Sequence, residues 1–244
     1  MILHIRFAWD DFPPVWIHSH ESVVKKHPFY HLAKSGFPDA AFHLITDTVS
    51  DMAVRQLKEI FQHHNPILVS AHAIEGTGVN SIPEAFADML AEHLGWQADS
   101  RIVQTNIVGH TGADGFSRLA RQAEFDGPVI SGGYYILVDD FVGQGGTLAN
   151  LRSHIIRGGG QVLGATVLTG KPYSARLALT GETLNNLRSK HGKELEDWWF
   201  QRFGFGFECL TESEARYLLR TPDADRIRNK IAAAVEIRNR RTDI

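Results

Sequence analysis

The sequence has a single cysteine, Cys209, among its 244 residues, and it has no long apolar run. A lone cysteine excludes a disulfide within the chain and a zinc site built from several cysteines, and it fits a reducing compartment. No stretch approaches the roughly 20 consecutive apolar residues that a membrane-spanning helix needs. We therefore expect a cytoplasmic protein that does not act on a membrane.

The chain also lacks an excess of charge of one sign. Its 25 basic and 28 acidic side chains give a formal net charge of −3, so the overall charge favours neither nucleic acid nor anionic lipid as a partner. The first residues, MILHIRFAWDDFPP, lack the basic segment, apolar stretch and cleavage site of a secretory signal peptide, and we expect none. The hydrophobic fraction of 43% is ordinary for a globular protein.

The middle of the chain alternates short β-branched apolar runs with amphipathic helical patterns. This alternation is typical of an α/β fold with a parallel sheet. A helix is predicted at residues 81–95, opened by a capping box of Ser81 and Glu84, and a later helix ends at the glycines 158–160. Strands are predicted at residues 66–71, 101–105, 134–140 and 161–169.

The length favours one domain with extensions over two large domains. We divide the chain into an N-terminal extension or hood element at residues 1–65, an α/β core at 66–172 and a mostly helical C-terminal extension at 173–244, forming one compact unit. Nearly thirty polar residues, 106–133, separate the second and third predicted strands. Because loops of this length in compact domains are usually functional lids or disordered, we predict a lid there.

The stretch YYILVDDFVGQGGTLANL, residues 134–151, ends a predicted strand on two acids and continues into a loop with few side chains. A glycine-rich turn between a strand and a helix is a natural phosphate site, because backbone N–H groups converge there and the helix N-terminus adds positive charge. The carboxylates of Asp139 and Asp140 would repel a second anion but accept hydrogen bonds from sugar hydroxyls. The stretch therefore predicts a sugar-phosphate site, with the phosphate at Gly143, Gln144, Gly145, Gly146 and Thr147.

Other phosphate-binding loops fit this stretch less well. No lysine follows Gly146, as a P-loop would require, and no G-x-G-x-x-G opens a helix after a strand. The remaining alternative is a tight strand-to-helix turn whose exposed acids only cap the helix.

The segment YILVDDFVGQGGT, residues 135–147, resembles the phosphoribosyl pyrophosphate (PRPP) motif of the type I phosphoribosyltransferases. That motif is a hydrophobic strand, two acids and a small-residue loop that ends in threonine. The resemblance is specific over this segment and architectural over residues 66–172, and its layout is closest to the competence-protein-F-like branch. It implies the Rossmann-like parallel sheet of that family, with Asp139 and Asp140 as the catalytic pair on the ribose hydroxyls and the 5-phosphate at residues 143–147.

The resemblance also implies a cofactor and an assembly. Mg²⁺ would bridge pyrophosphate oxygens and ribose hydroxyls, with Asp139 and Asp140 nearby and acting through water. Enzymes of this family are commonly homodimers, so we expect a homodimer.

Two further segments fall where the family binds pyrophosphate. The family's pyrophosphate loop corresponds to Ala73, Ile74, Glu75 and Gly76. In the predicted lid, Arg118 and Arg121 are the cations that we assign to pyrophosphate. The alternative is that both arginines lie on a solvated helix face.

The sequence gives weaker evidence for the acceptor, the molecule to which enzymes of this family transfer the phosphoribosyl group. Where members that use 6-oxopurines carry an aspartate as base, this chain has Gly143, which offers no group to take a proton. Lys171 lies where those enzymes place a lysine on the purine oxygen, but it fits a surface residue equally well. In the aromatic segment 196–210, Trp198 and Trp199 are suited to stack on a base or to pack the C-terminal extension.

These features predict a Mg²⁺-dependent phosphoribosyltransferase that transfers the 5-phosphoribosyl group from PRPP to a nitrogenous acceptor, with nucleobases among the candidates, and releases pyrophosphate. The alternative is a sensing or regulatory protein that binds PRPP or a nucleotide without turnover. A role in DNA uptake or in mobile elements would follow only from the competence-like resemblance.

Overall fold

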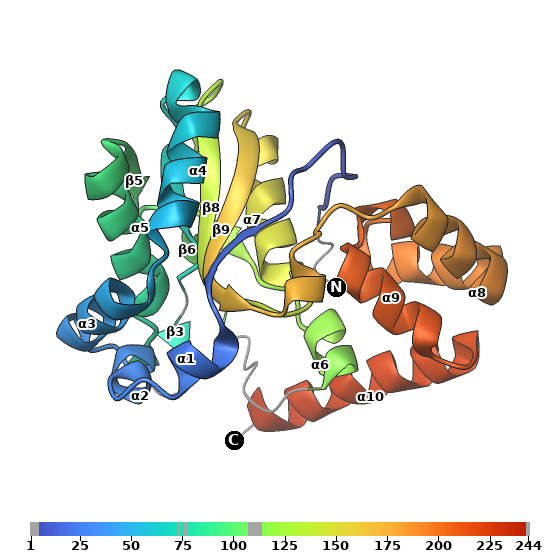
Figure 1. Cartoon of the computed structure of the whole chain (residues 1–244). Helices are drawn as coiled ribbons and strands as arrows, with labels where there is room; N and C mark the ends of the chain where they lie inside the picture. Colours follow the sequence, from blue (N-terminus) through green and yellow to red (C-terminus); the bar gives the residue numbers. More distant parts are fainter. Residues whose placement is uncertain (1–4, 73, 76–77, 107–113, 243–244) are drawn as a thin grey trace.

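The computed structural model describes residues 5–72, 74–75, 78–106 and 114–242 of the chain. A parallel sheet of five strands lies at its centre, in the order β1-β9-β8-β2-β5 (Figure 1). In that order the strands are β1 (Trp16–Ser19), β9 (Gln161–Gly170), β8 (Tyr134–Val142), β2 (Ile67–Ser70) and β5 (Gln97–Asp99). All four neighbouring pairs are parallel, which confirms the predicted α/β fold.

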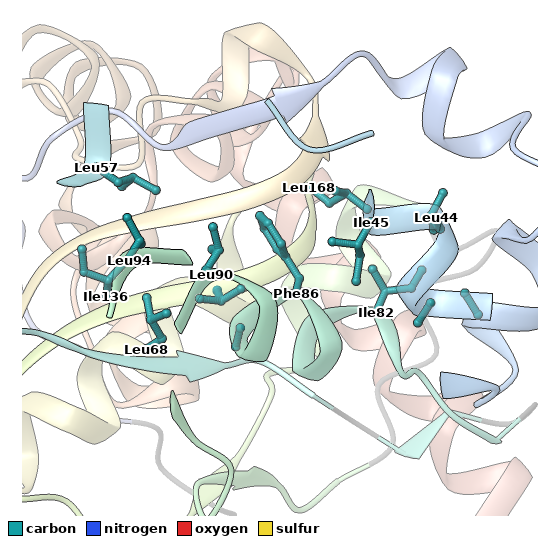
Figure 2. Close-up of a cluster of buried hydrophobic side chains, with 14 of the residues drawn as sticks. Leu44, Ile45, Leu57, Leu68, Ile82, Phe86, Leu90, Leu94, Ile136 and Leu168 are labelled. Atoms are coloured by element: carbon teal, nitrogen blue, oxygen red, sulfur yellow. The ribbon is translucent and has the colours of Figure 1, made fainter. Parts of the chain in front are cut away.

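Helices cover both faces of the sheet (Figure 1). One face carries α3 (Pro38–Thr48), α4 (Asp51–Phe61) and α5 (Ile82–Leu94), and the other carries α7 (Gly146–Arg157). Alternate strand residues point to opposite faces, and both sets are apolar. Leu68, Ile136 and Leu168 pack under α3, α4 and α5, as Figure 2 shows, whereas Val69, Leu137 and Val167 pack under α7. Strands buried on both faces appear in a sequence as continuous apolar runs, which is why β8 and β9 were predictable.

The strand predicted at residues 101–105 exists only in part, and its expected place in the parallel sheet is wrong. Residues Val103–Gln104 form β6, which pairs antiparallel with β7 (Phe125–Asp126) in a separate small sheet. The place beside β2 belongs to β5, a polar three-residue edge strand that has no apolar run to identify it. The apolar signal at 101–105 comes from Ile102, which is buried under the central sheet without being part of it.

The helix predicted at residues 81–95 is confirmed as α5, but its predicted capping box is wrong. Ser81 makes no side-chain cap, because its backbone is already close to helical, with φ −78° and ψ −11°. The Asn80 side chain binds a free N–H group at the helix start instead, since its Oδ1 accepts a hydrogen bond from the Ile82 N–H at 3.2 Å. Asn80 is thereby fixed at the start of α5, facing the interior.

The N-terminal segment contributes an edge strand to the sheet, because β1 pairs with β9. His18 joins this strand to its surroundings: its Nδ1 accepts from the Ser50 N–H at 3.2 Å, and its Nε2 lies 2.9 Å from Thr166 Oγ1. Burial lowers the pKa of His18 to about 4. The ring is therefore neutral near pH 7, with its proton on Nε2. The short helices α1 (Glu21–Lys25) and α2 (Tyr30–Lys34) follow β1.

The C-terminal residues form a second helical cluster beside the sheet (Figure 1). Its helices are α8 (Gly181–Phe203), α9 (Glu212–Arg220) and α10 (Ala224–Thr242), and they enclose α6 (Gly115–Ala120) from the middle of the chain. The remaining short elements are η1 (Gln62–His64), β3 (Ile74–Glu75), β4 (Gly78–Val79), η2 (Pro172–Ser174) and η3 (Phe207–Cys209). No helix in the described ranges is both long enough and apolar enough to cross a bilayer.

Candidate functional site

A cavity of about 320 Å³ lies at the carboxyl edge of β2 and β8. After β2 the chain passes through α5 to β5 on one side, and after β8 it passes through α7 to β9 on the other. These two helices cover opposite faces of the sheet, which leaves a crevice between the two strand ends. In α/β proteins, ligands bind at such points of reversed strand order.

Two acids of β8 line this cavity. Asp139 is only 8% exposed, and its Oδ1 accepts a hydrogen bond from the backbone N–H of Asp140 at 2.8 Å. Burial, reinforced by the neighbouring charge of Asp140, raises the pKa of Asp139 well above its usual value. Two carboxylates this close do not readily carry two charges, so the pair is best described as sharing one.

A lysine from the N-terminal segment pairs with the second acid. The Nζ of Lys34, at the end of α2, lies 2.9 Å from Asp140 Oδ2. Burial alone would raise the pKa of Asp140, but the Lys34 charge and hydrogen bonds involving Lys34, Asp139 and Asn80 hold it below its usual value. Asp140 is therefore the ionised member of the pair, and an ionised carboxylate accepts hydrogen bonds from hydroxyl groups.

The glycine loop follows β8 directly and leads into α7. Gly145 has φ +80° and precedes the helix without a capping side chain, and a Cβ atom there would come within 2.4 Å of Leu177. A Cβ atom at Gly146 would come within 2.7 Å of Glu214 Oε1. Glycine is thus required at both positions by close packing, and at Gly145 also by backbone conformation. Because no side chain caps α7, its first N–H groups can bind an anion.

Arg118 and Arg121 line the same cavity. The Nε atoms of both are buried, and neither has a hydrogen-bond partner among the described residues. A buried cationic N–H group without an acceptor is unfavourable. Two such groups beside a helix N-terminus therefore indicate a site for an anion, which guanidinium groups bind with paired hydrogen bonds.

The C-terminal helices hold Arg118 in place. Phe116 and Leu119 of α6 are buried in the C-terminal cluster, and the rings of Phe116 and Tyr217 lie edge to face at 5.0 Å. A Cβ atom at Gly115 would overlap the Tyr217 ring, so α6 contacts α9 as closely as the chain allows. Since Arg118 lies on α6, its position depends on this packing.

A buried ion pair packs against the start of α7, next to the glycine loop. Arg6 Nη1 lies 2.7 Å from Glu214 Oε2, with both side chains at most 2% exposed. The same guanidinium donates from Nη2 to Gln122 Oε1 at 2.6 Å. At the start of α9, Thr211 Oγ1 donates to the Gln144 carbonyl at 2.5 Å. The N-terminal segment and α9 are thereby both joined to the loop that precedes α7.

No family model matches the chain. The chain is 39% identical over 229 residues to Protein TraN of Escherichia coli, covering 94% of this chain and 51% of that protein. It is 42% identical over 154 residues to an uncharacterized protein of Haemophilus influenzae, covering 63% of this chain and 34% of that protein. The chain thus spans about half the length of the first of these curated relatives and about a third of the second.

Among solved structures, the chain is similar to several phosphoribosyltransferases. An adenine phosphoribosyltransferase has a TM-score of 0.38 at 15% identity, with 62% of this chain and 75% of that chain covered. The purine phosphoribosyltransferase of Pyrococcus horikoshii Ot3 has a TM-score of 0.35 at 18% identity, with 51% and 75% covered. The adenine phosphoribosyltransferase of Leishmania tarentolae has 0.34 at 14%, with 78% and 92% covered. Because these TM-scores are low, the assignment of the fold rests on the strand order of this chain.

The structure brings most of the predicted site residues together. The cavity is lined by Asp139, Asp140, residues 143–147, Arg118 and Arg121. The predicted pyrophosphate loop is described only in part: Ala73 and Gly76 lie outside the described residues, and Ile74 and Glu75 form β3, which pairs with β4.

The predicted acceptor residues do not line this cavity. Lys171 forms an ion pair with Glu21 on the surface, and its side chain is 43% exposed. Trp199 is fully buried among the C-terminal helices, with its ring 4.3 Å from that of Phe203, and Trp198 packs against the same cluster. A ring without exposed surface has no face for a base, so base stacking on Trp199 does not fit the structure.

The two acids fit Mg²⁺ only through water. In the described ranges, no group of three His, Cys, Asp or Glu side chains is placed to hold a metal ion. One oxygen of Asp140 already faces Lys34, and one oxygen of Asp139 accepts a backbone N–H. Because Mg²⁺ demands near-octahedral oxygen coordination, an ion here would take its ligands from a bound phosphate and from water.

Sequence reasoning missed several residues that line the cavity. Lys34, Asn80, Gln122 and Glu214 all line the cavity but belong to no catalytic or ligand-binding motif. Asn80 offered a weak signal, since an Asn immediately before a helical pattern is a candidate cap. Glu214 forms a capping box with Thr211, a pattern that predicts a helix start and not a place in the site. A single lysine on a short helix offers no signal, because it looks like any solvated side chain.

Proposed function

We propose that this protein is a phosphoribosyltransferase, which transfers the 5-phosphoribosyl group of PRPP to a nitrogenous acceptor and releases pyrophosphate. One observation carries the proposal: the acid pair of β8 and the glycine-rich start of α7 line one cavity, with Arg118 and Arg121 beside them. A ligand that fits this arrangement needs hydroxyl groups for the acids, a phosphate for the helix start and further anionic charge for the arginines.

In this proposal, each part of the site has one task. Asp139 and Asp140 accept hydrogen bonds from the ribose 2- and 3-hydroxyls, and residues 143–147 bind the 5-phosphate. The bond between C1 and the pyrophosphate oxygen breaks, a nitrogen lone pair of the acceptor forms the new bond to C1, and the acceptor proton passes to solvent. Arg118 and Arg121 stabilise the charge that develops on the departing pyrophosphate. Mg²⁺, when bound, would neutralise part of the same charge.

The positive charge that develops on the sugar ring favours the same site. Displacement at an anomeric carbon passes through an oxocarbenium-like state. The ionised Asp140 lies where it can hold the hydroxyls of that ring. Catalysis then comes from orienting the sugar and stabilising the leaving group, and it needs no base at position 143.

A second function, PRPP binding without turnover, is favoured by a specific observation. Gly143 provides no proton acceptor, and Lys171, Trp198 and Trp199, the acceptor residues suggested by the sequence, do not line the cavity. A sensing protein would need the PRPP contacts alone.

A pyrophosphate-release assay separates the two functions. The purified protein is incubated with PRPP and Mg²⁺ and challenged in turn with purines, pyrimidines and other nitrogenous acceptors. An enzyme releases pyrophosphate with at least one acceptor, and Asp140→Asn abolishes the release. Asp197→Asn, a matched change on the exposed face of α8, should leave it unchanged. No release with any acceptor, from a protein that binds PRPP, would favour the sensor.

A further inference from the structure

Among the described residues, Lys34 forms an ion pair with the acid pair. Its Nζ lies 2.9 Å from Asp140 Oδ2, and the two side chains are 24% and 12% exposed. The contact joins residues 106 positions apart in the sequence, on an N-terminal helix and on the central strand of the sheet. A pair at this depth is screened by solvent much less than a surface pair.

The backbone beside Lys34 is anchored to the frame of the site. Ala33 is fully buried, and its carbonyl accepts a hydrogen bond from the Ser81 N–H at 3.2 Å. Ser81 adjoins Asn80, whose side chain helps to hold the pKa of Asp140 below its usual value. Lys34 and Asn80 therefore reach the same carboxylate from two neighbouring elements, which fixes the ammonium group beside the acid pair.

We propose that Lys34 is the built-in counter-ion of the acid pair, so that a ribose phosphate binds to Asp139 and Asp140 without a divalent cation. The inference rests on the proposed function. It specifies which group balances the negative charge of the acids at the sugar-binding site. An ammonium group beside Asp140 supplies the positive charge that a metal ion would otherwise bring. A divalent cation is then taken up with the pyrophosphate group, whose oxygens provide the ligands that the acids lack.

The hydrogen-bonding capacity of both groups allows this arrangement. A carboxylate has about four lone-pair sites, so Asp140 can accept from Lys34 and from a sugar hydroxyl together. The ammonium group has three N–H donors, of which one is directed at Asp140. Without Lys34, the acid pair would lose the cation that contacts Asp140.

Lys193 provides a control outside the cavity. Its Nζ lies 2.7 Å from Asp197 Oδ1 on α8, and its side chain is 83% exposed. Lys193 does not line the cavity, so it forms an ion pair with an aspartate, as Lys34 does, without contact with the acid pair. A change from Lys to Met at position 193 alters the net charge as the same change at 34 does.

The test is a calorimetric titration with ribose 5-phosphate, performed once in EDTA and once in Mg²⁺. Wild-type protein should bind with the same affinity in both buffers. Lys34→Met should weaken binding in EDTA by about tenfold or more, the loss expected for a charged hydrogen-bonding group. Mg²⁺ should restore part of the affinity of Lys34→Met, and Lys193→Met should behave as wild type. Thermal melting shows whether each variant is folded.

Two results would overturn the inference. One is a wild-type protein that binds ribose 5-phosphate only with Mg²⁺, a comparison that needs no variant. The other is a folded Lys34→Met that binds as wild type in EDTA. Either leaves the proposed function standing, since the wild type still binds the sugar phosphate. A wild type that binds neither ribose 5-phosphate nor PRPP in either buffer would contradict the proposed function together with this inference.

Discussion

The Nη1 atom of Arg118 lies 3.2 Å from the position that a Cβ atom at residue 143 would occupy. The missing side chain at Gly143 therefore determines what Arg118 can contact. With glycine there, the guanidinium faces the cavity beside the phosphate loop. Any acidic side chain at that position would lie against it.

We predict that Gly143→Asp weakens anion binding. The new carboxylate would pair with Arg118 and repel a phosphate, so the affinity for inorganic pyrophosphate should fall about tenfold or more. Titration calorimetry measures this directly. Gly143→Ala controls for the steric contact, and Gly181→Asp, at an exposed helix start with no atom within 4 Å of the new Cβ, controls for the added charge. Equal affinity of Gly143→Asp and wild type would show that Arg118 does not serve the anion.

A second prediction concerns the buried nitrogen atoms of Arg118 and Arg121. Replacing either arginine by Met should lower the affinity for pyrophosphate about tenfold or more, because a charge-assisted hydrogen bond is lost. The melting temperature should hold or rise, since the Nε atoms have no partner among the described residues. Arg226→Met, on the exposed side of α10, is the matched control. A variant that melts earlier and still binds pyrophosphate normally would make the arginines structural.

The sequence could predict the centre of this site because its parts are contiguous. Within residues 134–151, a buried strand, two acids and a glycine-rich helix start follow one another, and each has a local signature. The strand is apolar because both faces of the sheet are covered, and the loop is glycine-rich because Leu177 and Glu214 leave no room for Cβ atoms. Local pattern and tertiary requirement agree here, so the prediction holds.

The remainder of the site depends on contacts that no local pattern records. Lys34 reaches Asp140 across 106 positions, and Arg6 reaches Glu214 across 208. The edge strands β1 and β5 have only four and three residues, too few for a periodic signal, and their place follows from pairing with β9 and β2. The base-stacking role suggested for Trp199 fails because an aromatic run predicts burial and stacking equally well.

The buried pair of Arg6 and Glu214 should dominate the stability of the region behind the glycine loop. Arg6→Met leaves a buried carboxylate without its cation and should lower the free energy of unfolding by about 3–5 kcal/mol. Arg188→Met, which breaks more exposed pairs with Glu196 and Glu208, should cost about 1 kcal/mol or less. Urea unfolding followed by circular dichroism measures both. If the two variants lose equal stability, the buried pair has no special role.

The neutral His18 predicts a pH dependence of stability. Its pKa is about 4 in the folded protein, below the ordinary value of 6.5, so between these values the unfolded state binds a proton that the folded state does not. The contribution of His18 to the free energy of unfolding should therefore be fully present above pH 6.5. It should decrease as the pH is lowered, by up to about 3 kcal/mol near pH 4. Urea unfolding of His18→Gln over the same range should lack this part of the decrease. Parallel curves for variant and wild type would contradict the assignment.

The central claim is that the acid pair of β8 and the glycine loop form a PRPP site, and PRPP binding tests it most directly. In a calorimetric titration with PRPP and Mg²⁺, the wild type should bind with a stoichiometry of about one per chain, as expected if the ligand occupies the cavity beside the acid pair. The double variant Asp139→Asn with Asp140→Asn should show no measurable binding, although its shape is nearly unchanged. A wild type that does not bind PRPP, or a folded double variant that binds it equally well, would contradict the account.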